Sequence, residues 1–332
     1  MNSLARRRLL RQMAALGAAT LLRSGRVAAE PLEVDRIRLV HSPSICLAPQ
    51  YLAEDLLRLE GFAHVEYVSE TLPKSWEAVA SGAADISMET APNLVSALDH
   101  GAELVAIGGI HAGCYELCAH AQIGAIRDLR GRSLAVSDFG GADHLFLSSI
   151  LAYVGIDPRT DVNWVVAGRT SETLRLFQER KVHAFLGFPP QPQLLREQKI
   201  GHTLLNTGED RPWSQYFCCM VTARRDFASR YPVATKRTLR ALLSAADMCA
   251  GEPERAAKLL AERGYERRYE VALDVLRSLP YRRWREADPE DTLRFYALRL
   301  RDVGMVRSTP QKIIAQGTDW RFFNELKKEL KA

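Results

Sequence analysis

Hydrophobic and polar positions alternate along this chain in a way that predicts helices joined to short buried strands, most clearly over residues 76–101. There an amphipathic helix ends at Gly82, a buried strand follows at 85–88, and a second helix begins at Pro92. Proline suits the first turn of a helix because its missing N–H would have no partner there. The turn 89–91 therefore lies between the carboxyl end of a strand and the amino end of a helix, where open α/β sheets hold ligands.

A weaker copy of this helix, strand and turn follows at 174–190, and the two turns predict two similar lobes that face one cleft. Between the two copies, a strand at 133–136 leads through a glycine turn at 137–141 into another helix. Strands that alternate with helices of this length predict mostly parallel sheets flanked by helices, an α/β fold. From residue 226 onward the pattern is almost wholly helical.

Length and charge narrow the functional classes. At 332 residues the chain is longer than most single cores support, which also favours two lobes. Its formal net charge is +5, but residues 1–29 hold six of the 45 basic residues and no acidic one. The rest of the chain has 39 basic and 40 acidic residues, a net charge of −1. A chain with this net charge has no excess of positive charge to attract the phosphates of a nucleic acid, so we expect no nucleic-acid partner.

The first 29 residues predict an export signal of the twin-arginine type. The run RRRLLR at 6–11 resembles the twin-arginine pattern, 13–22 is a small apolar core, and 27–29 offers small residues for cleavage before Glu30. The alternative is an ordinary amphipathic helix or an uncleaved anchor, but about ten apolar residues are too few to span a bilayer. No cysteine lies near the cleavage point to take a lipid anchor. We therefore expect a periplasmic protein from which residues 1–29 have been removed.

Six cysteines in an exported protein raise the possibility of disulfides, but their spacing disfavours them. Cys114 and Cys118 lie in a run that is typical of a strand, which sets them roughly 13 Å apart. Cys218 and Cys219 are adjacent, so bridging them strains the peptide. A twin-arginine substrate also folds in the reducing cytoplasm. We expect mostly buried thiols.

No motif predicts catalysis, a cofactor or a metal site. The chain lacks a G-x-S-x-G elbow, an H-E-x-x-H helix and a Walker loop. Residues 138–140 spell the kinase triplet DFG, but none of the motifs that accompany it is present. The eight histidines show no metal-ligand spacing on one helix. The chemistry that remains is that of turns suited to hold a small molecule.

The order of several segments resembles the periplasmic solute-binding proteins for sulfonates, nitrate, taurine and thiamine pyrimidine precursors. The segments are IRLVHSPS, ASGAADISMETAP, LVAIGG, IRDLRGRSLAVSDFGGADHLFLSSILAYVGIDP, VHAFLGFPPQP and TARRDFASRYPVATKRTLRALLSAADMCAGEPERAAKLLAERG. They cover about 34–264 of the chain. Each segment alone is a weak signal, and their order carries the resemblance.

The resemblance implies a two-lobed type II periplasmic binding protein fold with a helical C-terminal region. In that fold the chain passes twice between the lobes, and the crossings would fall near 122–126 and 217–221. Lobe one would then hold 33–124 plus 220–332, and lobe two would hold 125–219.

The turns that face the expected cleft supply the candidate ligand-binding residues. In the second lobe, the two glycines of 137–142 let backbone N–H groups approach a ligand at the positive end of a helix dipole. The candidates are Ser42, Ser44, Glu89, Thr90, His111, Tyr115, Ser137, Phe139, Gly140, Gly141 and Phe188. These turns supply no Lys or Arg, and Glu89 adds an acid. A neutral, zwitterionic or cationic solute with a flat ring, stacked on aromatic residues such as Phe139 or Trp213, is therefore as credible as a sulfonate.

The resemblance implies the solute-binding component of an ABC-type importer, a monomer that delivers a small-molecule solute to a permease in the inner membrane. The solute would be sulfonate-like or taurine-like, or a nitrogen-containing compound resembling a pyrimidine. One alternative is an enzyme like the thiamine-pyrimidine synthases. Those relatives use a lysine and a histidine where this chain has Glu89 and Asn93, so no lysine is placed to hold pyridoxal phosphate. Another alternative is an exported sensory protein of the same fold.

Overall fold

The structure, a computed structural model, describes residues 30–42, 44–69 and 75–330. The segment Glu33–Ala332 forms one compact unit. The predicted export signal at 1–29 lies outside the described residues. No helix in the described part of the chain is long and apolar enough to cross a membrane.

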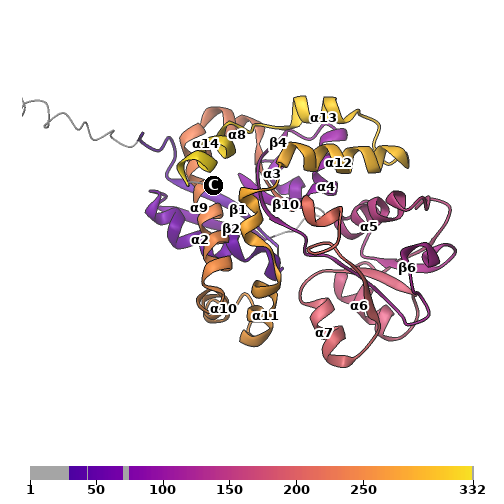
Figure 1. The fold of residues 1–332 in the computed structure, drawn as a ribbon. Helices are drawn as coiled ribbons and strands as arrows, with labels where there is room; N and C mark the ends of the chain where they lie inside the picture. Colours follow the sequence, from indigo (N-terminus) through magenta and orange to yellow (C-terminus); the bar gives the residue numbers. More distant parts are fainter. Residues whose placement is uncertain (1–29, 43, 70–74, 331–332) are drawn as a thin grey trace, which may run out of the picture. The chain divides into compact units, whose positions relative to one another are not determined.

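The first sheet has five strands in the spatial order β2-β1-β3-β10-β4. Figure 1 labels β1, β2, β4 and β10 of this sheet. They are β2 (His64–Ser69), β1 (Arg36–His41), β3 (Ile86–Thr90), β10 (Phe217–Arg224) and β4 (Leu104–Ala112). β1 runs parallel to β2 and β3, whereas β10 is antiparallel to both β3 and β4. The sheet is therefore mostly parallel, and its one reversed strand, β10, comes from much later in the sequence than its neighbours.

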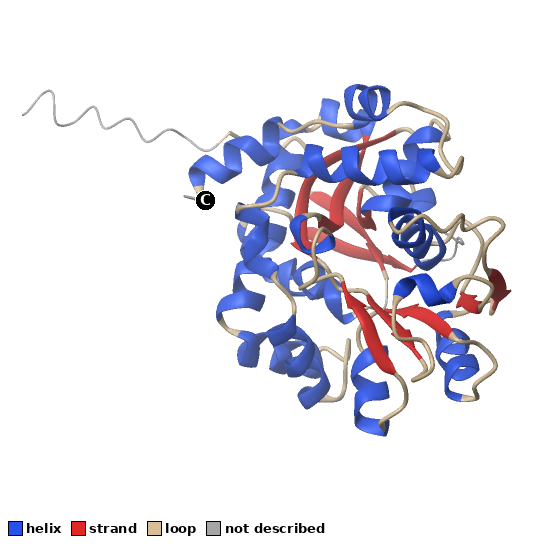
Figure 2. Ribbon diagram, turned by 45° about the vertical axis from the view of Figure 1, so that its right-hand side comes forward, coloured by secondary structure: helices blue, strands red, loops and turns tan. Residues whose placement is uncertain are grey.

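The second sheet repeats this design in the order β7-β6-β8-β5-β9. Its strands are β7 (Asn163–Val166), β6 (Ser133–Val136), β8 (Ala184–Gly187), β5 (Glu116–Ala119) and β9 (His202–Asn206). Here β5 is the reversed strand, antiparallel to β8 and β9. Figure 2 shows the two groups of strands with helices around them. The predicted α/β fold with two mostly parallel sheets is confirmed.

Helices follow the strands as the sequence predicts. Those of the first half are η1 (Ile45–Leu47), α2 (Ala48–Leu59), α3 (Ser75–Ala80) and α4 (Ala91–Asp99), and those of the second are η2 (Ile126–Leu129), α5 (Ala142–Tyr153), α6 (Thr170–Gln178) and α7 (Gln191–Gln198). α4 begins at Ala91 with Pro92 in its first turn, where the ring needs no N–H partner. This start holds Glu89 and Thr90 at the carboxyl end of β3.

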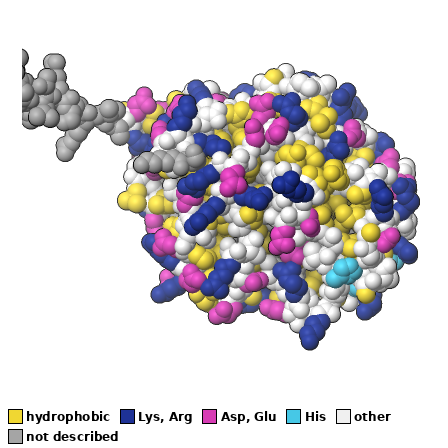
Figure 3. Space-filling view, viewed as in Figure 1, with side chains coloured by type: hydrophobic (Ala, Val, Ile, Leu, Met, Phe, Trp, Pro, Cys, Tyr) yellow, Lys and Arg dark blue, Asp and Glu magenta, His cyan; other side chains and the backbone are white. Residues whose placement is uncertain are grey.

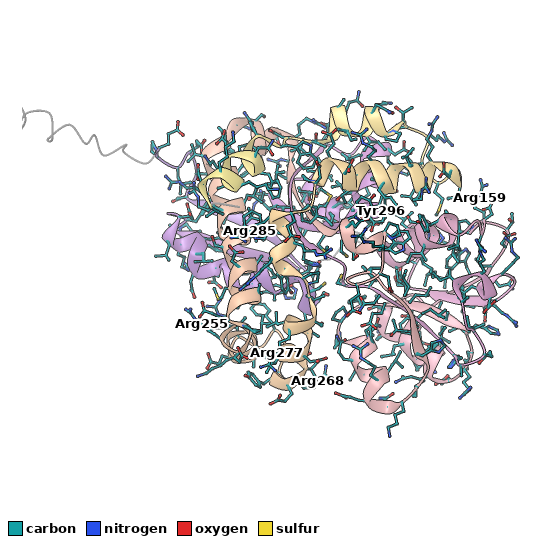
Figure 4. All side chains as sticks on the ribbon, in the orientation of Figure 1. Arg159, Arg255, Arg268, Arg277, Arg285 and Tyr296 are labelled. Atoms are coloured by element: carbon teal, nitrogen blue, oxygen red, sulfur yellow. The ribbon has the colours of Figure 1, made fainter. Side chains whose placement is uncertain are left out.

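The C-terminal region is helical, as predicted. After η3 (Trp213–Gln215) and β10 come α8 (Arg225–Arg230), α9 (Pro232–Gly251), α10 (Pro253–Glu262), α11 (Tyr269–Ser278), η4 (Tyr281–Arg285), α12 (Pro289–Asp302), α13 (Pro310–Gly317) and α14 (Arg321–Glu329). α12 starts at a true cap, because the Asp288 carboxylate accepts from the N–H groups of Glu290 and Asp291. It packs against both α4 and α5. Its Tyr296, labelled in Figure 4, is buried. The Tyr296 ring lies 5.3 Å from that of Phe146 on α5, so the C-terminal region contacts both halves.

The crossings between the sheets differ from the predicted positions near 122–126 and 217–221. β5, which the predicted boundaries place in lobe one, pairs only within the second sheet. The first crossing therefore lies at 113–115, between β4 and β5, and the second at 207–216, between β9 and β10. All of β4 and β5 is buried, so the hydrophobic pattern does not reveal where one sheet ends and the other begins.

The two crossing segments lie directly against each other. A Cβ on Gly113, which has φ +42, would lie 2.2 Å from the Cα of Gly208, so only glycine allows this approach. Next to it, the Tyr115 N–H donates to Thr207 Oγ1 at 3.0 Å and the Thr207 N–H donates to the Tyr115 carbonyl at 2.9 Å. These contacts join the two passages of the chain into one connection.

All six cysteines lie in the described residues, and all are buried, as the sequence predicts. The face of the molecule drawn in Figure 3 carries charges of both signs side by side. That mixture fits the near-neutral balance of the chain beyond residue 29.

Candidate functional site

A pocket of about 310 Å³ lies where the turns of the two sheets meet. The first half contributes Ser42, Ser44, Cys46, Leu47, Met88, Glu89, Thr90 and Asn93 to its wall, with Cys219 from β10. The second half contributes Ser137, Asp138, Gly141, Ala142, Asp143, Thr170 and Phe188, and the first crossing adds Cys114 and Tyr115. Small-molecule sites commonly enclose about 300–1,000 Å³, so the pocket suits a compact solute.

Most of the residues predicted for the site line this pocket. They are Ser42, Ser44, Glu89, Thr90, Tyr115, Ser137, Gly141 and Phe188. They meet because each lies near the carboxyl end of a strand or at a crossing, and the carboxyl ends of neighbouring parallel strands share one edge of a sheet.

Three predicted residues do not line the pocket. Phe139 is 54% exposed, and its ring meets the edge of His144 at 5.1 Å instead of facing a solute. Gly140 donates its N–H to His144 Nδ1 at 3.0 Å, which ties the turn to its own helix. His111 is fully buried on β4, next to the pocket-lining cysteines. Trp213, also considered for stacking, is buried against Phe146 and does not line the pocket.

The second-half turn is shaped by one carboxylate at the start of α5. Asp143 accepts from the Ser137 N–H at 2.6 Å, from the Ser137 hydroxyl at 2.9 Å and from the His144 N–H at 2.9 Å. Burial raises the pKa of Asp143, and the bonds from Ser137 oppose that rise. Because the Asp143 oxygens already accept these hydrogen bonds from the protein, Asp143 positions the turn. A solute must bind to other groups of the pocket wall.

Glu89 is the buried carboxylate of the first-half wall. Its side chain accepts from the Ser87 hydroxyl at 2.9 Å, and Ser87 lies 2.8 Å from the Thr222 hydroxyl on β10. Glu89 is only 2% exposed. Among the described residues that line the pocket, Glu89, Asp138 and Asp143 are acidic and none is Lys or Arg. This wall favours hydrogen-bond donors and positive charge.

Two buried polar atoms in the wall have no hydrogen-bond partner among the described residues. They are Thr90 Oγ1 and Asn93 Oδ1. A buried polar atom left without a partner costs about 1–3 kcal/mol, so native proteins rarely leave two together. Both belong to the start of α4, and both become satisfied if a solute brings polar groups to them.

An aromatic wall stands on the other side. The rings of Tyr115 and Phe188 meet edge to face at 5.9 Å, and the Phe146 ring lies 5.0 Å from that of Tyr115. Burial raises the pKa of the Tyr115 phenol well above its ordinary value, so the phenol is neutral at physiological pH. Such a wall suits a flat or apolar part of a solute.

Residues 73–263, more than half of the chain, match the profile of the NMT1-like family. This chain belongs to the NMT1-like family. No curated protein sequence matches it.

Solved structures confirm the fold of this NMT1-like protein. The periplasmic nitrate-binding protein NrtA from Synechocystis PCC 6803 superposes with a TM-score of 0.75 at 16% identity, over 91% of this chain and 90% of that one. The alkanesulfonate-binding protein SsuA from Xanthomonas axonopodis pv. citri, bound to MOPS, gives 0.69 at 18% identity, over 85% and 96%. The desulfurization enzyme DSZB gives 0.58 at 14% identity, over 89% and 99%. The resemblance to periplasmic binding proteins is therefore confirmed at the level of fold.

Several wall residues of the NMT1-like pocket were not predicted as site residues. They are Cys46, Leu47, Met88, Asn93, Cys114, Asp138, Ala142, Asp143, Thr170 and Cys219. Asn93 lies in the first turn of α4, four residues after Glu89, and its place at the start of that helix could have revealed it. The cysteines come from three separate elements, and no motif links them.

Proposed function

We propose that this chain is the solute-binding component of an ABC-type importer and captures a small organic solute in the pocket between the two sheets. The observation that carries the proposal is the pair Thr90 Oγ1 and Asn93 Oδ1, buried without described partners on a wall of that pocket. The fold shared with proteins described as nitrate-binding and alkanesulfonate-binding supports it. The proposal includes export to the periplasm, action as a monomer and docking on an inner-membrane permease.

The solute that fits this wall carries a nitrogen that donates a hydrogen bond or bears a positive charge. Nitrate and alkanesulfonates are anions, and an anion beside the buried Glu89 carboxylate is repelled with little solvent screening. An amino, amidine-like or protonated ring nitrogen instead donates to Glu89 and offsets the cost of keeping that carboxylate buried. The flat part of such a solute, pyrimidine-like in size, packs on Tyr115 and Phe188. A taurine-like zwitterion has an amino group that can donate to Glu89, but it has no flat part to pack on Tyr115 and Phe188.

Capture follows from contacts with both halves. A solute that touches Glu89 in the first half and Phe188 in the second favours the closed arrangement, because it binds that arrangement more tightly than the open one. The closed arrangement is then the form a permease recognises.

A thermal-shift screen of the purified chain tests the proposal. The compounds are nitrate, alkanesulfonates, taurine, aminopyrimidines and simple amines. A compound that binds only the folded chain raises the melting temperature, and we expect aminopyrimidines or amines to do so. A shift with nitrate or alkanesulfonates alone contradicts the proposed solute class. No shift with any class contradicts the proposed capture of a small organic solute.

The variant Glu89→Gln sharpens the test. Loss of a charged hydrogen bond should weaken solute binding by about 1.5–3 kcal/mol, roughly 10-fold to 150-fold. The unliganded melting temperature should hardly change, because the amide oxygen still accepts from Ser87. The matched control is Asp138→Asn, an exposed carboxylate at the same pocket, which should cost far less because solvent screens it. Equal losses in both variants would show that Glu89 has no direct contact.

We propose binding and not catalysis, although DSZB shows that this fold also serves an enzyme. Glu89 and Asn93 occupy the turn where a synthase-like relative would need its lysine and histidine, and neither side chain can form a Schiff base. Recovery of the bound solute chemically unchanged after prolonged incubation checks this point. A sensory role for the same pocket would be indicated by solute binding without permease-dependent uptake.

A further inference from the structure

Three cysteines and one histidine from four separate parts of the chain converge beside the pocket. Cys46 belongs to η1, His111 to β4, Cys114 to the first crossing and Cys219 to β10. Their donor atoms, three sulfurs and one imidazole nitrogen, all lie within 4.8 Å of one another, and all four residues are buried. We propose that these four residues form a zinc-binding site in this chain.

The spacing of the donor atoms fits a tetrahedral ion. Zn²⁺ binds thiolate sulfur at about 2.3 Å and imidazole nitrogen at about 2.0–2.1 Å, so neighbouring donors around it lie roughly 3.5–3.8 Å apart. Donors that already lie within 4.8 Å reach this arrangement by small side-chain rotations. A mixed set of three thiolates and one imidazole matches the Cys₃His sets of zinc proteins. The imidazole also favours zinc over ions that prefer thiolates alone.

One ring nitrogen of His111 is available to bind a metal ion. Its Nδ1 lies 3.2 Å from the carbonyl of Ala112, which makes Nδ1 the protonated donor and leaves a lone pair on Nε2. Nε2 is buried and has no hydrogen-bond partner among the described residues. A ligating histidine characteristically donates its other N–H to a carbonyl in this way, and the metal then satisfies the lone pair.

Surrounding groups hold the donors in place. Tyr281 of η4 packs its ring edge to face on His111 at 5.4 Å, and its hydroxyl donates to the Cys46 carbonyl at 3.1 Å. The Ser44 hydroxyl lies 3.0 Å from Cys46 Sγ. Cys219 is the register partner of His111, and the ladder between β4 and β10 is irregular on both sides of it. An irregularity of this kind re-aims side chains, as it often does near functional sites.

The position gives the ion a consequence beyond local stability. Cys46, Cys114 and Cys219 also line the solute pocket, so the ion would close the floor of that pocket. It would also tie η1 to both passages of the chain between the sheets, because Cys114 lies in the first crossing and Cys219 lies near the start of β10, the strand that follows the second. The inference does not rest on the proposed function, since zinc binding is measured without any solute.

Zinc binding by the full chain tests the proposal. Cys218 Sγ lies only 3.1 Å from Cys114 Sγ, so the chain is first reduced with a non-thiol reductant to keep Cys114 available. It is then freed of metal with a chelator and titrated with Zn²⁺ alone. We expect one ion per chain and a raised melting temperature. Failure of the reduced chain to take up zinc overturns the proposal, whatever solute the chain binds.

Variants show which residues hold the ion. Cys114→Ser and His111→Ala should weaken zinc binding about 100-fold or more, since even outer partners of a metal site are worth about 10–100-fold. Cys118→Ser and Cys249→Ser are matched controls, because both cysteines are buried and outside the cluster, and they should bind zinc like the parent. Equal losses in the controls, or full binding by both ligand variants, overturn the assignment.

A measurement on the parent chain guards against variants that fail to fold. Co²⁺ in place of zinc should give thiolate-to-cobalt charge-transfer absorption and the ligand-field bands of a tetrahedral site. Bands typical of octahedral cobalt with no charge transfer would show that surface carboxylates, and not the cysteines, take the metal.

Discussion

Replacing the buried His144 by a residue that does not titrate should reduce the loss of folding stability at acidic pH. His144 lies in the first turn of α5, 7% exposed, with its Nδ1 accepting the N–H of Gly140 at 3.0 Å. Trp164 packs edge to face on its ring at 4.9 Å. Burial lowers the pKa of His144 to about 4, against a weaker opposing effect of Asp138. A protonated His144 would lose the bond from Gly140 and place a positive charge at the positive end of a helix.

The sign and size of the effect follow from the two pKa values. The unfolded chain binds the proton near pH 6.5 and the folded chain only near pH 4, so protons favour the unfolded chain in between. Stability is therefore complete above about pH 6.5 and falls as the pH drops towards about 4. A shift of about 2.5 units corresponds to about 3 kcal/mol, of which about 2.5 kcal/mol is lost by roughly pH 4.5.

Urea unfolding at about pH 7.5 and about pH 4.5 measures this difference. His144→Asn keeps an acceptor for the Gly140 N–H but does not titrate, so it should lose about 2.5 kcal/mol less than the parent between the two pH values. Burial also lowers the pKa of His120, which makes the difference between parent and variant the informative quantity. His202→Asn, at an exposed position on β9, is the matched control and should behave like the parent. Identical losses in parent and His144→Asn would refute the reasoning.

Two further predictions concern packing and export. Gly109→Ala should lower the free energy of unfolding by about 1–3 kcal/mol in urea, because its Cβ would lie 2.4 Å from the Phe217 ring. Gly124→Ala, where the nearest atom is 3.7 Å away, is the control, and an equal effect in both would contradict the packing argument. Replacing Arg6 and Arg7 together by Lys should reduce the periplasmic yield in a fractionation experiment. An unchanged yield would show that the twin-arginine assignment is wrong.

Most of the helices and strands could be predicted because each is marked by its own stretch of sequence. The strand predicted at 133–136 is β6, and that predicted at 85–88 overlaps β3, since buried runs between Gly and Pro are visible in the sequence itself. The crossings were misplaced for the opposite reason. β5 is buried in either sheet, so its pattern is the same whichever sheet it joins, and only the available strand edges decide its place.

The same contrast applies to the candidate site. Glu89, Thr90 and Ser137 were predicted because each lies at or just after the carboxyl end of a buried strand, at the edge where ligands bind. Cys46 and Cys219 could not be found in this way, because their sulfur atoms meet only through tertiary packing, which brings η1 and β10 together, and His111 joins them through the register between β4 and β10. Phe139 was misjudged because an aromatic residue in a glycine turn can point either way, and here it points to solvent.

The position of β10 also dictates the order in which the molecule can be completed during synthesis. β10 lies between β3 and β4, yet the ribosome makes it about 105 residues after β4 ends, a delay of about 5–20 s at common elongation rates. Throughout that interval the growing chain carries two buried-type strands with open edges, which are sites for pairing with other chains. The second sheet, made entirely from 116–206, has all its strands by then. A nascent chain that stalls before Phe217 is therefore a candidate for aggregation, and the second sheet is the part that can fold first.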